Sequence, residues 1–267
     1  MSDLPRENVF GHTHKVMLFR SACAALREDR RALRILDVGC GSGYAVTRFL
    51  GEQEDEVLGI DLHEPSIAFA KRHFERHGVR FECRSAESIK DSKQKFDVVI
   101  LADILEHLDE PLEVLKACHA LLNDAGLLLV TVPNGLGPFE IESAISRLPV
   151  LGHLLLRAAA AFVGVLNRFG PLKGTWTAAL AEAPADLPYN AESGHVQFFS
   201  CRALRHLMDT AGFDVIDRRN LSFLSGPFTN TLFNPFIALC RLNVKIARTL
   251  PAPIVSGWFF KARVSGR

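Results

Sequence analysis

The feature that most constrains this fold is a short apolar segment, residues 34 to 38, that leads into three glycines at alternate positions, Gly39, Gly41 and Gly43. The apolar segment is β-branched enough to form a buried strand, and residues 44 to 50 are expected to form a helix after the glycines. Glycine is required where the backbone adopts a positive φ or approaches a ligand without an intervening Cβ. A strand, a glycine turn and a helix in this order predict a site for a nucleotide-like cofactor.

Two other residues of the turn narrow the class of cofactor. A dinucleotide-binding turn follows the pattern G-x-G-x-x-G, and Tyr44 stands where that pattern needs its third glycine. Asp37 would repel a pyrophosphate, whereas its negative charge would stabilise a cationic sulfonium amino acid. Both observations weaken an NAD-dependent oxidoreductase as an alternative.

Asp61 ends the next expected strand, residues 57 to 61, and lies 22 residues beyond Gly39. A carboxylate at this separation can accept hydrogen bonds from both hydroxyl groups of a ribose, and a strand-end cap is the structural alternative. With this acid in place, the glycine turn resembles the motif of class I S-adenosylmethionine-dependent methyltransferases of the small-molecule type. The resemblance covers residues 34 to 132 and 194 to 222 well, and it covers the last strand only loosely.

The resemblance implies S-adenosyl-L-methionine as the cofactor and a set of binding residues at the ends of the strands. Ala86 is expected to offer backbone groups to the adenine ring and Glu87 a side chain, although Glu87 would also suit the start of a helix. The full implied set is Asp37, Gly39, Cys40, Gly41, Gly43, Asp61, Leu62, Ala86, Glu87, Asp103 and Ile104.

Strand and helix patterns alternate along much of the chain. This alternation predicts an α/β fold, a Rossmann-like doubly wound sheet whose ligands bind at the carboxyl ends of the strands. Strands are expected at residues 34 to 38, 57 to 61, 79 to 83, 96 to 101, 127 to 132, 213 to 221 and 257 to 264, and helices at residues 12 to 28, 65 to 77, 111 to 122 and 201 to 211. In the family that the chain resembles, a helix in the place of the first one leans over the cofactor, but here we expect it to serve in packing. In the family that the chain resembles, the last of seven strands runs antiparallel between the fifth and the sixth.

The same patterns divide the chain into parts. We expect an N-terminal helical segment at residues 1 to 33, a cofactor-binding core at 34 to 134, a helical insertion at 135 to 194 and the rest of the core at 195 to 267, with a second helical insertion at 225 to 256. The resemblance does not extend to the two insertions. The identity of the substrate is therefore expected to depend on them.

Each insertion contains an apolar helical stretch with a narrow line of cations, at residues 150 to 168 and at residues 236 to 250. The uncharged run within the first stretch is ten residues long, too short to span a bilayer. Such helices suit peripheral contact with an anionic membrane, and they would equally suit a lid over an apolar pocket. Both alternatives favour a hydrophobic or lipid-like acceptor.

The composition excludes several classes of protein. With 267 residues, 48% of them hydrophobic and 23% charged, the chain can form one large domain or a domain with a cap. Its formal charge is +1, yet residues 218 to 267 contain eight Lys or Arg and no acid, which indicates a surface for a partner of opposite charge. The six cysteines have no metal-finger spacing, the polar N-terminus does not resemble a signal peptide, and the basic residues are not interleaved with stacking aromatics. We expect a cytoplasmic protein, membrane-associated at most, that binds no nucleic acid.

Two histidines near the expected carboxyl edge of the sheet, His107 and His195, are the candidate catalytic residues. Either could remove a proton from a hydroxyl acceptor, and a hydrogen-bonded structural imidazole is the alternative for each. The stretch Asp103-x-x-Glu106-His107 also resembles the Glu-x-x-Glu-His metal-binding motif of the ubiquinone-pathway O-methyltransferases, with Asp in place of the first Glu. Because a Glu-His pair is common at this place without a metal role, we assign no metal ligand.

The sequence therefore predicts an enzyme that moves a methyl group from S-adenosylmethionine to an oxygen of a small hydrophobic or lipid-like acceptor by in-line displacement. An alternative is a membrane-docked or accessory protein that binds the cofactor without turnover. A further alternative is a protein methyltransferase. Cofactor binding without any methylated product would favour the accessory protein.

Overall fold

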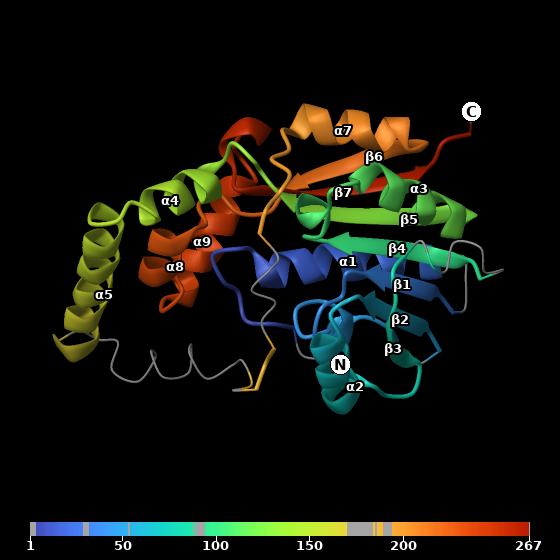
Figure 1. Cartoon of the computed structure of the whole chain (residues 1–267), viewed down its shortest axis with the longest axis horizontal. Coiled ribbons are helices and arrows are strands. Elements are labelled where there is room, and N and C mark those ends of the chain that lie inside the picture. The colour runs from blue at the N-terminus through green and yellow to red at the C-terminus, as the bar shows by residue number, and fades with distance from the viewer. Residues whose placement is uncertain are drawn as a thin grey trace.

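The computed structural model describes residues 4–28, 32–52, 54–86, 88, 94–169, 184, 186–188 and 194–266. Its centre is a seven-stranded sheet with the strand order β3-β2-β1-β4-β5-β7-β6 (Figure 1). The first five strands pair in parallel, and β7 runs antiparallel to both of its neighbours. The strands are β1 (Arg34–Val38), β2 (Glu56–Asp61), β3 (Val79–Cys83), β4 (Phe96–Ala102), β5 (Leu122–Pro133), β6 (Phe213–Asn220) and β7 (Gly257–Val264). The predicted Rossmann-like fold with an antiparallel last strand is confirmed.

Both faces of the sheet are covered, which explains why its central strands are continuous apolar runs instead of alternating ones. One face packs against α3 (Pro111–Leu121) and α7 (Cys201–Thr210). The other face packs against α1 (His12–Arg27) and α2 (Glu64–Phe74). The carboxyl ends of the parallel strands therefore share one edge, where the predicted polar residues meet.

The helices of the core begin and end within three residues of their predicted limits. Ser200 caps α7 as expected, because its hydroxyl accepts a hydrogen bond of 3.1 Å from the Ala203 N–H. α2 ends before the predicted Gly78, since Glu75 is already extended and Arg76 forms a β-bridge with Val79.

The prediction of a helix at residues 44 to 50 is wrong. The segment contains turns and one short 3-10 helix, Thr47–Phe49. Seven residues between two glycines leave little length for helix nucleation. In addition, the Thr47 hydroxyl turns inward and donates a 2.6 Å hydrogen bond to Asp37, while the Arg48 guanidinium stacks 3.8 Å from the centre of the Tyr44 ring. Tertiary contacts of these side chains thus replace the regular helix.

Helices from the two insertions lie together at one end of the sheet (Figure 1). They are α4 (Pro138–Ser146), α5 (Leu151–Phe169), α8 (Pro227–Phe233) and α9 (Ile237–Ala247). The first insertion contacts the second through Glu142, whose carboxylate accepts hydrogen bonds from the N–H and the hydroxyl of Thr229. Asn243 of α9 donates to the carbonyl groups of Val9 and Leu224, so the second insertion also contacts the N-terminal segment. We call α4, α5, α8 and α9 the helical cap.

No single helix among the described residues is long and apolar enough to cross a membrane. α4 and the first sixteen residues of α5 reach the required length and hydropathy only as a pair, and the chain bends by 107° between them.

Candidate active site

The glycine turn follows β1 and faces the carboxyl edge of the sheet. Gly39, Gly41 and Gly43 all adopt a positive φ, of 70°, 54° and 69°. A Cβ on Gly39 would lie 2.6 Å from Cγ1 of Ile104, whereas a Cβ on Gly41 would meet nothing within 4 Å. Gly39 therefore allows close packing against the segment after β4, and Gly41 leaves the turn open on its outer side. Gly43 packs in the same way against Phe81 of β3.

Asp37 lies beneath this turn and is almost completely buried. Its Oδ2 atom accepts the hydrogen bond from Thr47, while Oδ1 is buried without a hydrogen-bond partner among the described residues. Burial raises the pKa of the Asp37 carboxyl to about 7, and the neighbouring charge of Asp61 adds to this effect. A buried acceptor without a partner is costly, and a cationic or N–H-bearing ligand at the turn would relieve that cost. Burial also raises the pKa of the neighbouring Cys40 thiol, which favours an unreactive thiol.

Asp61 lies at the end of β2, next to the glycine turn as predicted. Its Oδ2 accepts a 2.8 Å hydrogen bond from the Gly41 N–H, and its Oδ1 accepts one of 2.8 Å from the His63 N–H. Each carboxylate oxygen has a second lone pair, so Asp61 can still accept hydrogen bonds from a ligand. The carboxylate thus stabilises the turn as a strand-end cap and can still bind a ribose, so the two alternatives that the sequence left open are compatible.

A cleft of about 480 Å³ opens beside Asp61 and the glycine turn. Leu62 is exposed at its edge, Ala86 is buried in its wall, and Ile104 lines it opposite Gly39. Glu87 lies outside the described residues, so its predicted contact with adenine stays a prediction. The size of the cleft, the open turn and the unpaired carboxylate oxygen of Asp37 fit S-adenosylmethionine.

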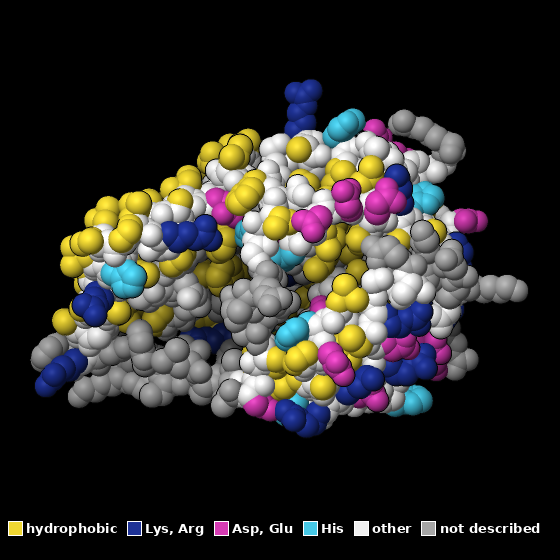
Figure 2. Space-filling view, in the orientation of Figure 1, with side chains coloured by type: hydrophobic (Ala, Val, Ile, Leu, Met, Phe, Trp, Pro, Cys, Tyr) yellow, Lys and Arg dark blue, Asp and Glu magenta, His cyan; other side chains and the backbone are white. Residues whose placement is uncertain are grey.

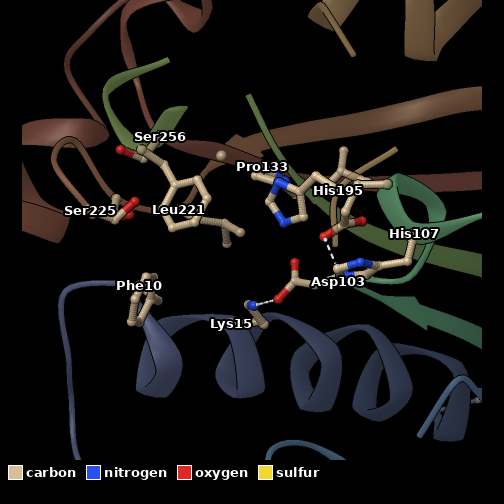
Figure 3. A pocket seen from close by; sticks show the side chains of 14 residues that line it. Phe10, Lys15, Asp103, His107, Pro133, His195, Leu221, Ser225 and Ser256 are labelled. Atoms are coloured by element: carbon tan, nitrogen blue, oxygen red, sulfur yellow. Dashed lines mark hydrogen bonds and ion pairs between the residues drawn. The ribbon is translucent and has the colours of Figure 1, made fainter. Parts of the chain in front are cut away.

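A second, smaller cavity of about 200 Å³ lies next to this cleft (Figure 3). His107 lines both cavities. The other walls of the second cavity are formed by residues from the N-terminal segment, the sheet edge and the cap. Its apolar wall includes Phe10, Val132, Phe139 and Leu221, and its polar wall includes Ser222, Ser225 and Ser256. A pocket for a partly apolar molecule therefore adjoins the cofactor cleft.

The two predicted histidines meet at this second cavity. The centres of the His107 and His195 rings are 5.0 Å apart, with the rings edge to face. His195 Nδ1 lies 2.7 Å from Oε1 of Glu140 in α4, and His107 Nδ1 lies 3.0 Å from the Gly194 carbonyl oxygen. Because a carboxylate only accepts hydrogen bonds, an ionised Glu140 makes His195 Nδ1 the donor. Nε2 of a neutral His195 is then the basic nitrogen of that ring.

Asp103 directly follows β4 and has the unusual φ of 54°. Its side chain is among those that line the second cavity and not the cofactor cleft, where the resemblance had placed it. The carboxylate forms an ion pair with Lys15 of α1 (Figure 3). It also accepts a 2.8 Å hydrogen bond from Thr131. Burial acts to raise the pKa of Asp103, but the charge and hydrogen bonds of Lys15 and Thr131 hold that pKa below its ordinary value. Non-glycine residues with a positive φ are often retained at functional sites.

Glu106 is buried beside these groups, and its Oε2 atom has no hydrogen-bond partner among the described residues. Burial, followed by the charge of Asp103, raises the pKa of Glu106 well above its ordinary value. Glu106, His107 and His195 each offer one ligand atom, and these atoms lie within 4.8 Å of one another. One carboxylate and two imidazoles can hold a divalent metal ion. His195 here stands where the motif resemblance would have used Asp103, which Lys15 already engages.

Sequence reasoning missed two charged residues of this site, Lys15 and Glu140. The helix that contains Lys15 was expected to serve in packing, and Glu140 lies in an insertion that the resemblance does not cover. Asn134, a polar residue at the same sheet edge, is structural, because its amide donates 2.8 Å hydrogen bonds to the Pro253 and Val255 carbonyls.

The chain matches the model of the methyltransferase domain family over residues 12–218. Because this match spans most of the chain, the protein belongs to that family. A ubiquinone biosynthesis O-methyltransferase from Cereibacter sphaeroides is 36% identical over 104 residues, which are 38% of this chain and 42% of that protein. The chain thus matches less than half the length of this curated relative.

Two solved structures have the same fold over most of the chain. An S-adenosylmethionine-dependent methyltransferase from Clostridium acetobutylicum has a TM-score of 0.54 and 10% identity, over 95% of this chain and 92% of that one. The plantazolicin methyltransferase BamL, solved with S-adenosylhomocysteine, has a TM-score of 0.53 and 15% identity, over 94% of this chain and 84% of that one. The family match and the fold place the chain among the class I S-adenosylmethionine-dependent methyltransferases, and the cleft fits S-adenosylmethionine as the cofactor.

Proposed function

We propose that this enzyme methylates an oxygen atom of a small hydrophobic or lipid-like molecule that binds in the second cavity. The observation that carries the proposal is the Glu140–His195 pair, which faces a partly apolar pocket adjoining the cofactor cleft. The names of the ubiquinone-pathway relatives support an oxygen acceptor, over the part of the chain that they match.

The cofactor, when bound, supplies a methyl group that is already activated on a sulfonium sulfur. The residues that would hold it are those of the glycine turn and of the cleft: Asp37, Gly39, Cys40, Gly41, Gly43, Asp61, Leu62, Ala86 and Ile104. Asp103, through its contact with Lys15, would hold the segment after β4 in place between the two cavities.

A hydroxyl acceptor must lose a proton as it reacts, and His195 is the base that we propose. Glu140 orients the ring through Nδ1, so that Nε2 accepts the proton from the acceptor hydroxyl. The resulting imidazolium is stabilised by the adjacent carboxylate, as in other base and carboxylate pairs. His107 would help to confine the acceptor, since it lines both cavities.

The walls of the second cavity favour an acceptor with both an apolar body and a polar group. Phe10, Phe139 and Leu221 would contact the apolar part, and the hydroxyl groups of Ser225 and Ser256 would bind polar atoms of the acceptor. Closure by the cap would exclude water from the reacting atoms.

The test is single-turnover and steady-state methyl transfer from labelled S-adenosylmethionine to fractionated lipids and metabolites. His195→Ala should lower kcat by about 10² to 10⁴, the contribution of a general base, with little change in cofactor affinity. Glu140→Gln should lower kcat less and shift the pH profile, while His206→Ala on the exposed side of α7 is the matched control. Full turnover by His195→Ala on the true acceptor would show that His195 is not the general base.

Two other outcomes would select an alternative. Turnover that is lost on chelation and restored by a divalent metal ion with affinity for imidazole, such as Zn²⁺, would favour a metal held by Glu106, His107 and His195 over a base. Cofactor binding without methylated product from any fraction would favour an accessory protein, and methylated polypeptides would favour a protein methyltransferase.

We further propose that the cap binds the surface of an anionic membrane, with the enzyme otherwise in the cytoplasm. Large apolar side chains of α5 are exposed, and Figure 2 shows hydrophobic atoms gathered over this end of the molecule. They include Leu151, Leu154, Leu155, Phe162 and Val165. Arg147 and Arg157 lie near them, a combination that suits an acyl boundary with anionic headgroups.

The second predicted membrane helix contributes less to this surface than its sequence indicates. In α9, Cys240, Val244 and Ala247 are buried. Arg248, at the C-terminal end of this helix, forms a hydrogen bond with His14. Sedimentation with vesicles tests the proposal: binding should require anionic lipid and weaken with salt. A protein that stays in the supernatant at low salt would refute it.

A further inference from the structure

A third cleft, of about 530 Å³, borders α1. It is bounded by α1, by β6 and β7, and by the end of α9. It shares no lining residue with the cofactor cleft or the acceptor cavity, although the neighbours His14 and Lys15 of α1 line different cavities. The cleft therefore has no part in the methyl transfer proposed above.

The described residues that line this cleft carry a marked excess of positive charge. They include four cations and one acid: Arg218, Arg219, Arg248, Lys261 and Asp217. All of the cations come from the acid-free segment of the sequence after residue 217. A concave surface with one sign of charge concentrates ligands of the opposite sign.

Hydrogen bonds hold three of the four cations in place. Arg248 donates to Nδ1 of His14 at 3.0 Å, and Nε of Arg219 lies 3.0 Å from Oδ2 of Asp217. Arg218 donates to the side-chain oxygen of Asn220 at 2.9 Å. Each of these bonds uses one nitrogen of a guanidinium group, which has five N–H donors in all, so donors remain for a ligand.

Lys261 is the fourth cation, and it lies opposite Asp217 in the pairing of β6 with β7. The apolar part of the cleft is formed by Leu18, Leu250 and Phe259. A ligand that fits would therefore carry several negative charges at one end and an apolar or planar body at the other.

We propose that this cleft binds a phosphate-bearing ligand, a phosphomonoester or a diphosphate, through Arg219, Arg248 and Lys261. Guanidinium groups match the oxygens of phosphate in a two-pronged geometry, and the net charge of the lining suits an anion with more than one charge. The phosphate could belong to a soluble molecule or to a lipid headgroup, which have the same recognition chemistry.

His14 provides a reporter inside the cleft. Burial and then the charge of Arg248 lower the pKa of His14 to about 4, and Arg219 of β6 acts in the same direction. Lys261 of β7 and Asp217 of β6 are the other charged groups in the lining. A bound anion would offset the cations, so the pKa of His14 should rise when the cleft is filled.

Calorimetry with inorganic pyrophosphate, together with NMR titration of the histidines, tests the proposal. Pyrophosphate should bind the full chain and raise the pKa of His14, and Lys261→Gln or Arg248→Gln should weaken binding by about tenfold or more. Arg205→Gln, which removes an exposed cation from α7 on the opposite face of the sheet, is the matched control and should bind normally.

The second experiment measures binding to vesicles of phosphatidylcholine with and without phosphatidic acid. Because the helical cap could also bind such vesicles, the Lys261→Gln variant separates the two surfaces. Binding that needs phosphatidic acid and is lost in Lys261→Gln, without pyrophosphate binding, would identify a lipid headgroup as the source of the phosphate. The proposal is overturned if neither probe binds, or if Arg205→Gln weakens binding as much as Lys261→Gln does. Neither readout depends on methyl transfer.

Discussion

The carboxyl edge of the sheet and the helical cap differ in how their side chains are used. At the sheet edge, Asp37, Asp61 and Glu106 are held by the backbone or by burial before any ligand arrives. In α5, by contrast, most described side chains are exposed, and only Gly152 and Val163 are buried. The edge is thus built to hold polar groups in one geometry, while α5 is free of most packing constraints within the chain.

This difference predicts which substitutions each region tolerates. A change at the sheet edge alters backbone conformation, buried charge and cofactor binding together. A change on α5 should leave folding intact and alter only what the helix contacts outside the chain. Substitutions in the two regions can therefore test the comparison directly.

The largest effect is expected at Asp37, whose raised pKa makes stability depend on pH. The pKa of Asp37 is about 7 in the folded state, above the ordinary value of 3.8. The contribution of Asp37 to the free energy of unfolding is therefore fully present below pH 3.8, and it is lost as the pH rises through the folded-state pKa of about 7. At about 1.4 kcal/mol per pKa unit, the cofactor-free wild type should lose on the order of 4 kcal/mol relative to Asp37→Asn between pH 4 and 8. Urea unfolding of both proteins across this range measures the difference. Parallel pH profiles would show that the buried carboxylate costs nothing.

A matched pair of glycine substitutions should give the next largest contrast. Gly39→Ala introduces a Cβ at positive φ and 2.6 Å from Ile104, and it should destabilise the fold by about 2 to 4 kcal/mol and abolish cofactor binding. Gly164→Ala in α5 places its Cβ in open space and should stabilise the protein by about 0.5 to 1 kcal/mol. Thermal unfolding compares the two. Equal losses in both variants would contradict the distinction between the regions.

Asp61→Ala should weaken S-adenosylmethionine binding by about 1.5 to 3 kcal/mol, as expected for hydrogen bonds to a charged acceptor. Asp61→Asn retains one acceptor oxygen for the Gly41 or His63 N–H and should lose less. Calorimetry gives both affinities. Unchanged affinity in an Asp61→Ala variant that still unfolds cooperatively would remove Asp61 from the cofactor site.

The smallest effect on stability is expected on α5. Phe162 is 58% exposed, so Phe162→Ser should change the free energy of unfolding by no more than about 0.5 kcal/mol. The same variant should bind anionic vesicles more weakly in sedimentation. Ser146→Ala, which removes a small polar side chain from α4 of the cap, serves as a control. A strongly destabilised Phe162→Ser variant would show that α5 packs more tightly than its exposure indicates.

The local pattern of the sequence determined the strands, the glycine turn and the position of Asp61. Each of these features depends on residues that are close in sequence: an apolar run, glycines at alternate positions, and an acid where a strand ends. The helix expected after the glycines was wrong, because Thr47 and Arg48 make tertiary contacts that no local propensity contains. The fifth strand begins five residues earlier than predicted, at Leu122. The family resemblance gave the place of the last strand, antiparallel between the fifth and the sixth.

The tertiary structure alone decided which charged groups meet. Lys15 and Asp103 are separated by 88 residues, and Glu140 and His195 by 55, so no local pattern can pair them. Their contacts arise because the first turns of α1 and helix α4 of the cap both reach the carboxyl edge of the sheet. Placing a polar side chain against a partner far away in the sequence depends on a geometry that the whole fold supplies. For this reason the sequence by itself indicated the histidine but not the carboxylate that orients it.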